Sequence, residues 1–82
     1  MPTRAEILEQ FRLPGRVAFE IEPHRHEGMW RVKISHQGDP TKLMRPDYAR
    51  RFAKAIRTVD PELAERIDAC VETAERYAMD SN

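Results

Sequence analysis

Hydrophobic side chains recur along this chain with two different periods. Between Met44 and Tyr77 they are three and four residues apart, which is typical of amphipathic helices. Between Arg16 and Ser35 they alternate with polar residues, which is the period of a half-buried strand. Two C-terminal helices and a preceding hairpin are therefore expected to share one apolar core.

A short N-terminal helix is expected over residues 3–12. Thr3 and Glu6 have the spacing of a capping box, in which each side chain accepts a hydrogen bond from the other residue's backbone. Pro14 and Gly15 then favour a turn, which would end the helix. A helix this short is marginal alone, so it must dock against the rest of the chain.

Residues 16–44 are expected to form a β-hairpin or a three-stranded meander. Strands are predicted at 16–22 and 29–35, joined by a polar connection at 23–28, with a short third strand at 41–44. The inward face of the hairpin is expected to consist of Val17, Phe19, Ile21, Trp30, Val32 and Ile34. For Trp30, a core position is favoured over a role in stacking a base or anchoring a partner.

The charges on the outward face support this pairing. Glu20 and Glu22 on the first strand are expected to face Arg31 and Lys33 on the second, and opposite charges across strands are favourable.

Tandem helices are expected over residues 46–78. Pro46 suits a first helical position, where a missing N–H costs nothing. The segment Thr58-Val59-Asp60-Pro61 divides the helices, since Asp60 can cap the second helix and Pro61 can begin it. Residues 79–82 should fray. The prediction is a single domain, 1–82, with a two-layer α+β fold in the order α-β-β-(β)-α-α.

Charge is segregated along a chain whose net charge is zero. Residues 25–57 carry nine basic and three acidic groups, net +6, whereas residues 58–82 have a net charge of −5. The part of helix 46–57 that lies off its apolar stripe is basic. Together with the hairpin, it supplies the candidate residues for binding a partner or nucleic acid: Arg31, Lys33, Arg50, Arg51, Lys54 and Arg57.

Two interpretations of this basic face remain open. It is either a solvated surface, also usable for protein contacts, or a surface that binds nucleic-acid phosphates. A helix-turn-helix with residues 61–78 as the recognition helix is disfavoured, because the acidic side chains of that helix would repel a duplex.

Neither a metal nor a cofactor is expected. His24 and His26 share one side of an extended segment, but His36 should lie at the opposite end of the sheet, about five strand residues away at ~3.3 Å each. Cys70 is the only cysteine, so no intrachain disulfide can form. Its place on an apolar helical stripe predicts a small buried side chain rather than a reactive thiol.

The motifs of catalysis are absent from the sequence. There is no nucleophile elbow and no glycine-rich phosphate loop, so we expect neither an enzyme nor a small-molecule substrate. No stretch approaches the ~18 apolar residues of a membrane span, and the N-terminus lacks the pattern of a signal peptide. With its single cysteine, the chain is expected to be cytoplasmic, without membrane contact.

The leading expectation for function is therefore a small non-catalytic interaction or regulatory domain that acts through protein contacts. Its partner would be another protein or a second copy of itself, with Tyr77 and Met79, or Phe11 and Leu13, as candidate dimer contacts. The alternative is nucleic-acid binding through the basic face of helix 46–57.

Overall fold

The computed structural model describes residues 1–13, 18–36 and 42–80 and confirms the α+β prediction. Three antiparallel strands form one open sheet in the order β1-β2-β3. Among the described residues, no helix is long and apolar enough to cross a membrane. The elements are α1 (Arg4–Gln10), β1 (Glu20–His26), β2 (Met29–Ser35), β3 (Lys42–Met44), α2 (Pro46–Ile56) and α3 (Pro61–Asp80).

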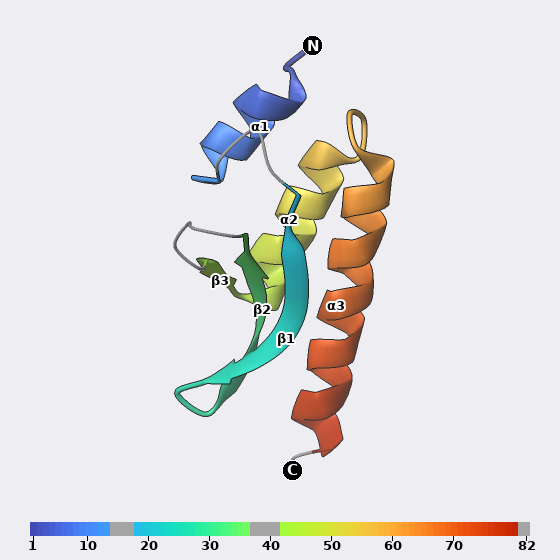
Figure 1. Ribbon diagram of the computed structural model, residues 1–82. Helices are drawn as coiled ribbons and strands as arrows, with labels where there is room; N and C mark the ends of the chain where they lie inside the picture. Colours follow the sequence, from blue (N-terminus) through green and yellow to red (C-terminus); the bar gives the residue numbers. More distant parts are fainter. Residues whose placement is uncertain (14–17, 37–41, 81–82) are drawn as a thin grey trace.

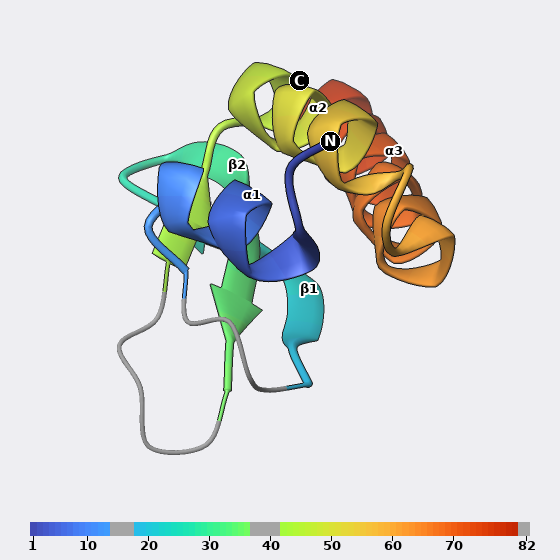
Figure 2. The same cartoon turned by 90° about the horizontal axis from the view of Figure 1, so that it is seen from above.

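Helices α2 and α3 form one layer and the sheet forms the other. Figures 1 and 2 show α2 and α3 side by side on one face of the sheet, while α1 lies near the end where the α2–α3 turn is found. The largest fully buried side chain is Phe52 of α2, and burial of a side chain of this size contributes about 1.5–3 kcal/mol. It shares the core with residues of the sheet and of α3, including Val32, Ile34, Ile67 and Val71.

The hairpin differs from the prediction at its turn. The expected connection at 23–28 is wrong, because β1 continues through Pro23 to His26. The turn consists of Glu27 and Gly28 alone, with φ of 53° and 80°. Two successive residues with positive φ match the twist of a tight two-residue hairpin. Pro23 is tolerated within the strand because β1 is an edge strand.

The longer strand fixes the cross-strand pairs. Glu22 lies opposite Lys33, as expected, and its carboxylate is 3.3 Å from the Lys33 ammonium. Glu20 instead faces Ser35, and Arg31 faces His24. The predicted charge pairing is therefore half right.

The predicted inward face is largely confirmed. Phe19, Val32 and Ile34 are buried, and Ile21 is partly buried against the same core. Val17 lies outside the described residues. Trp30 is half-buried rather than fully in the core, and its ring centroid lies 4.9 Å from that of Tyr77 on α3.

Helix α1 has the predicted capping box. The Thr3 hydroxyl accepts a hydrogen bond from the Glu6 N–H at 3.2 Å, and the Glu6 carboxylate accepts one from the Thr3 N–H at 3.1 Å. The hydrogen bond from the Thr3 N–H, and after it the interaction of the Thr3 side chain with the same carboxylate, lower the pKa of Glu6. Pro14 and Gly15, which were expected to stop the helix, lie outside the described residues, and the helix already ends at Gln10.

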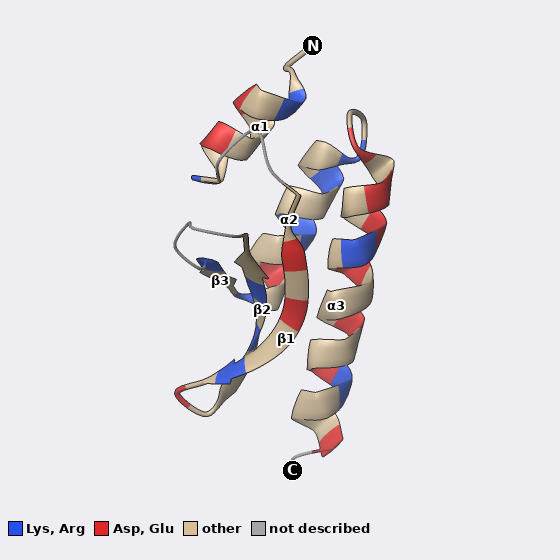
Figure 3. Cartoon of the chain, in the orientation of Figure 1, with Lys and Arg blue, Asp and Glu red and all other residues tan. Residues whose placement is uncertain are grey.

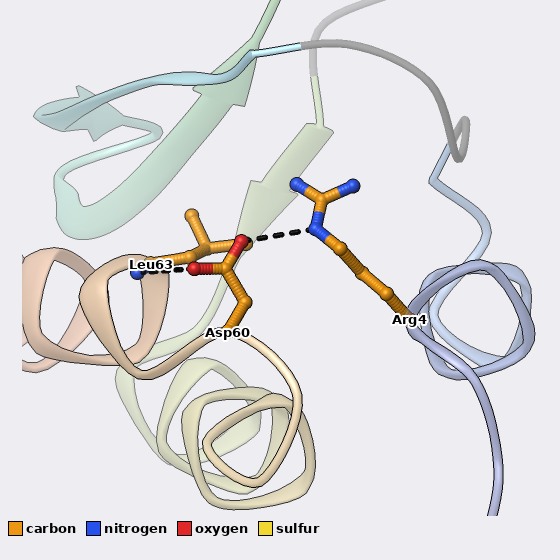
Figure 4. Close-up of polar contacts among 3 residues, drawn as sticks. All are labelled: Arg4, Asp60 and Leu63. Carbon is orange, nitrogen blue, oxygen red and sulfur yellow. Dashed lines mark hydrogen bonds and ion pairs between the residues drawn. The ribbon is translucent and has the colours of Figure 1, made fainter.

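Asp60 makes the junction of all three helices. One carboxylate oxygen accepts the N–H of Leu63 at 3.1 Å, which caps α3, and the other accepts the Arg4 Nε–H of α1 at 2.9 Å (Figure 4). Burial alone would raise the pKa of Asp60, but these hydrogen bonds and the charges of Arg4 and Arg66 lower it below its ordinary value. The predicted cap is confirmed.

Cys70 is buried on the inner side of α3, as predicted. Burial raises the pKa of its thiol, and the nearby charge of Glu22 acts in the same direction. A buried thiol that is protonated more firmly than usual is a packing residue rather than a nucleophile.

The lowered pKa of Asp60 generates a prediction for acid stability. Because the unfolded chain has the higher pKa, near the ordinary value of 3.8, the charged carboxylate stabilises the fold above about pH 4. That contribution is lost as pH falls through the folded-state pKa. Asp60→Asn keeps an acceptor for Leu63 but removes the charge. We expect it to unfold at lower urea than the wild type at pH 7, with a smaller difference at pH 3.

Asp60→Ala also removes the cap, which lowers the free energy of unfolding by about a further 1 kcal/mol. Asp80→Asn, at the exposed end of α3, is the matched control. It should change the unfolding in urea neither at pH 7 nor at pH 3. A difference between wild type and Asp60→Asn that stays constant from pH 7 to pH 3 would contradict the assigned role of the charge.

Candidate functional site

The basic face of α2 is partly neutralised within the fold. Arg50 pairs with Glu75, and Arg57 pairs with Asp68. In Figure 3 the basic positions of α2 lie beside the acidic positions of α3. The hydrogen bond to Glu75 raises the pKa of Arg50, which holds this guanidinium charged. These two arginines therefore join α2 to α3 and offer less charge to a partner than the sequence indicates.

The other predicted site residues also include both paired and unneutralised cations. Lys33 is paired with Glu22 across the strands. Arg51 lies over the ring of Tyr48, with its Cζ 5.4 Å from the ring centroid, and Lys54 is exposed one turn further along α2. Within the described part of the chain, neither Arg51 nor Lys54 has an acidic partner.

A pocket of about 340 Å³ opens at the β3 edge of the sheet. Its walls come from the end of α1, from β2 and β3, and from the first turn of α2. The described residues that line it include four cations and no carboxylate. The lining consists of Phe11, Arg12, Arg31, Lys42, Leu43, Met44, Arg45 and Tyr48.

Arg31 is one of the two partly buried cations in this lining, the other being Lys42. The Nε–H of Arg31 is buried and has no hydrogen-bond partner among the described residues. A buried donor without an acceptor costs free energy that an incoming acceptor would recover. Arg31 also lines the pocket, where its guanidinium adds positive charge.

The first turn of α2 adds positive potential to the same place. Its N-cap residue is Arg45, whose side chain makes no capping hydrogen bond. The first N–H groups of a helix have no acceptor within the helix and attract anions; in α2 these are the N–H groups of Asp47 and Tyr48, because Pro46 has none. Asp47 offsets part of this charge, but it does not line the pocket.

Arg12 has an unusual backbone conformation at the pocket's rim. Its φ is 60°, in the left-handed region that normally favours glycine. The N–H of Leu13 donates to the Leu8 carbonyl at 2.8 Å, and the N–H of Arg12 donates to Glu9 at 2.9 Å, which together form a Schellman motif. The left-handed position of this motif is usually glycine, and an arginine there costs about 1–2 kcal/mol. Because strained backbone is often found at functional sites, the strain at Arg12 favours a functional role for its side chain in the pocket.

Two rings of α2 contact Phe11, the residue that follows α1, beside the pocket. Phe11 makes an edge-to-face contact with Tyr48, at 5.4 Å between centroids, and lies 4.9 Å from Phe52. Phe11 is thus half-buried inside the molecule, and Leu13 is buried. This pair therefore offers less surface to a second copy of the chain than the sequence indicated.

The structure regroups the predicted site residues. Of the six, Arg31 lines the pocket and Lys33, Arg50 and Arg57 are paired, whereas Arg51 and Lys54 have no acidic partner among the described residues. The pocket adds three cations that the prediction omitted: Arg12, Lys42 and Arg45. For Lys42 and Arg45 the strongly basic segment was a signal, whereas nothing in the sequence connects Arg12 with them.

The histidines do not assemble into a site. His24 and His26 lie towards the hairpin turn, whereas His36 follows the far end of β2, so their predicted separation is confirmed. In residues 1–13, 18–36 and 42–80, no three histidine, cysteine, aspartate or glutamate side chains are grouped as metal ligands would be. Compared with known protein families, curated proteins and solved structures, this chain has no match.

The strain at Arg12 generates a second prediction. Arg12→Gly relieves the left-handed conformation, so the free energy of unfolding should stay level or rise by up to about 1 kcal/mol in urea titrations. Arg12→Lys keeps both the charge and the strain, and it should match the wild type. A loss of stability in Arg12→Gly would instead mean that the arginine side chain supports packing.

Proposed function

We propose that this protein is a non-catalytic module that binds nucleic acid through its phosphates. The proposal rests on one observation, the grouping of cations that have no acidic partner among the described residues. They are Arg12, Arg31, Lys42, Arg45, Arg51 and Lys54, and we call them the open basic surface. The first four line the pocket, Arg51 lies over a ring that lines it, and Lys54 follows one turn later.

The chemistry of the surface supports this choice. Phosphate contacts by lysine and arginine supply most non-specific nucleic-acid affinity, because they release condensed counterions. Tyr48, half-buried between the pocket and Arg51, also presents an aromatic ring of the kind used by proteins that bind single strands. The interface differs from the predicted one: it centres on the β3 edge rather than on the whole outer side of α2.

Binding is tested by titrating the protein with labelled duplex and single-stranded DNA and RNA at about 50 and about 200 mM salt. We expect affinity that falls steeply as salt rises. Replacing two phosphate-contacting residues, in Lys42→Gln with Arg45→Gln, should weaken binding at least tenfold and reduce the slope of log K against log salt by about two.

The matched control is Arg25→Gln with Arg76→Gln. It removes the same charge from exposed residues of β1 and the last turns of α3, outside the open basic surface. It should leave the salt dependence nearly unchanged. Equal losses in the two double variants would mean that overall charge, not this surface, drives binding, and no binding at the lower salt would refute the proposal.

A second candidate function is protein contact with another copy of this chain. The observation in its favour lies at the far end of α3, where Tyr77 is 41% and Met79 is 77% exposed. Tyr77 lies on the same side of α3 as the buried Ala74, one turn nearer the C-terminus. The C-terminal end of α3 and the hairpin turn lie towards the same end of the molecule (Figure 1). A second chain would remove this apolar surface from water.

Self-association is tested by sedimentation equilibrium between about 10 µM and about 1 mM, a range that reaches weak interfaces. We expect the mass of two chains at the upper end and a shift towards one chain in Met79→Glu. Met79 is so exposed that this change should not affect folding. Val59→Glu, in the α2–α3 turn, is the control and should behave as the wild type. A single-chain mass at every concentration would refute the candidate.

A further inference from the structure

We infer that the pocket at the β3 edge is a site for a phosphomonoester dianion, in addition to the phosphodiesters of a nucleic-acid backbone. The inference rests on the proposed function, because it assigns a specific ligand group to the centre of the same open basic surface. The dianion has two possible sources: a free mononucleotide, or the phosphorylated end of a nucleic-acid strand.

The concentration of charge favours a dianion. Four cations from three separate parts of the chain converge on one pocket of about 340 Å³, and none of its described lining residues is a carboxylate. A backbone phosphodiester carries a single negative charge, whereas a phosphomonoester carries about −1.5 to −2 at pH 7. A continuous strand spreads its charges along a surface, but a terminal phosphate brings its full charge to one point.

The donors in the pocket are also held in place. Arg31 extends from the central strand and is partly buried, which limits the orientations of its guanidinium. In the first turn of α2, Pro46 has no N–H, so the backbone donors without a helical acceptor are those of Asp47 and Tyr48, and of these two residues only Tyr48 lines the pocket. Oxygen atoms of a phosphomonoester can accept hydrogen bonds from several directions, so these donors and the flanking cations can be satisfied together.

The apolar part of the lining leaves room for more than the phosphate. Leu43, Met44, Phe11 and Tyr48 give the pocket an apolar and aromatic side. Its volume lies near the lower end of the ~300–1,000 Å³ range of small-molecule sites. This composition suits a sugar and a base attached to the phosphate better than it suits an inorganic anion alone.

The experiment compares single-stranded DNA carrying a 5′-phosphate with the same strand carrying a 5′-hydroxyl, by fluorescence anisotropy at about 150 mM salt. A label at the 3′ end leaves the compared end free. We expect the phosphorylated strand to bind at least tenfold more tightly. Adenosine monophosphate should compete for the site, whereas adenosine should not, and inorganic phosphate should compete more weakly than the nucleotide.

Three variants locate the effect. Arg31→Gln and, separately, Lys42→Gln should abolish the preference for the phosphorylated end. Lys54→Gln, on the open basic surface but outside the pocket, should weaken both strands equally and keep the preference. Urea midpoints measured for each variant show which variants are folded. The side chain of Lys42 is partly exposed at the sheet edge, so Lys42→Gln still tests the pocket if Arg31→Gln unfolds.

The outcomes separate the two proposals. Salt-sensitive binding with equal affinity for both strands would overturn the phosphomonoester site and leave the proposed function standing. Binding of adenosine monophosphate without binding of either strand would support the site, identify a free nucleotide as its ligand and overturn the proposed function. Binding of neither nucleotide nor strand would overturn both.

Discussion

The carboxylate of Asp60 is the contact on which the arrangement of the helices depends. The carboxylate caps α3. The backbone N–H of Asp60 donates to the Ile56 carbonyl at 2.8 Å, which closes the turn after α2. The second carboxylate oxygen holds Arg4, and with it a helix of seven residues that is too short to persist alone. Because Phe11 and Arg12 directly follow α1, this junction helps to position two of the eight described residues that line the pocket.

Most of the architecture was predictable from periodicity, and the exceptions have physical causes. The two C-terminal helices begin at Pro46 and Pro61 as expected, because proline, caps and apolar stripes all agree there. The hairpin turn was misplaced because His24 and His26 are polar, and a polar segment was taken for a connection. On an edge strand, side chains that face solvent carry no apolar signal, so pairing with β2 decides how far the strand extends.

The candidate site was less predictable than the fold because charge counts along a sequence do not show which charges meet. Arg50 and Arg57 belong to the most basic segment, yet the antiparallel packing of α2 and α3 places them beside Glu75 and Asp68. Arg12 reaches the pocket only through the docking of α1 and a left-handed residue that no periodicity encodes. The basic character of the segment was visible in the sequence, but the surface that remains unpaired was not.

Opposite charges on different sides of a neutral molecule have a consequence for how it approaches other molecules. The chain has no net charge, so a distant polyanion exerts almost no net force on it. The open basic surface and the acidic outer positions of α3 nevertheless form an electric dipole, on which the field of a polyanion exerts a torque. This torque weakens more steeply with distance than the attraction of a net charge. The protein would thus turn its pocket towards a partner only within about one Debye length, ~8 Å at physiological salt.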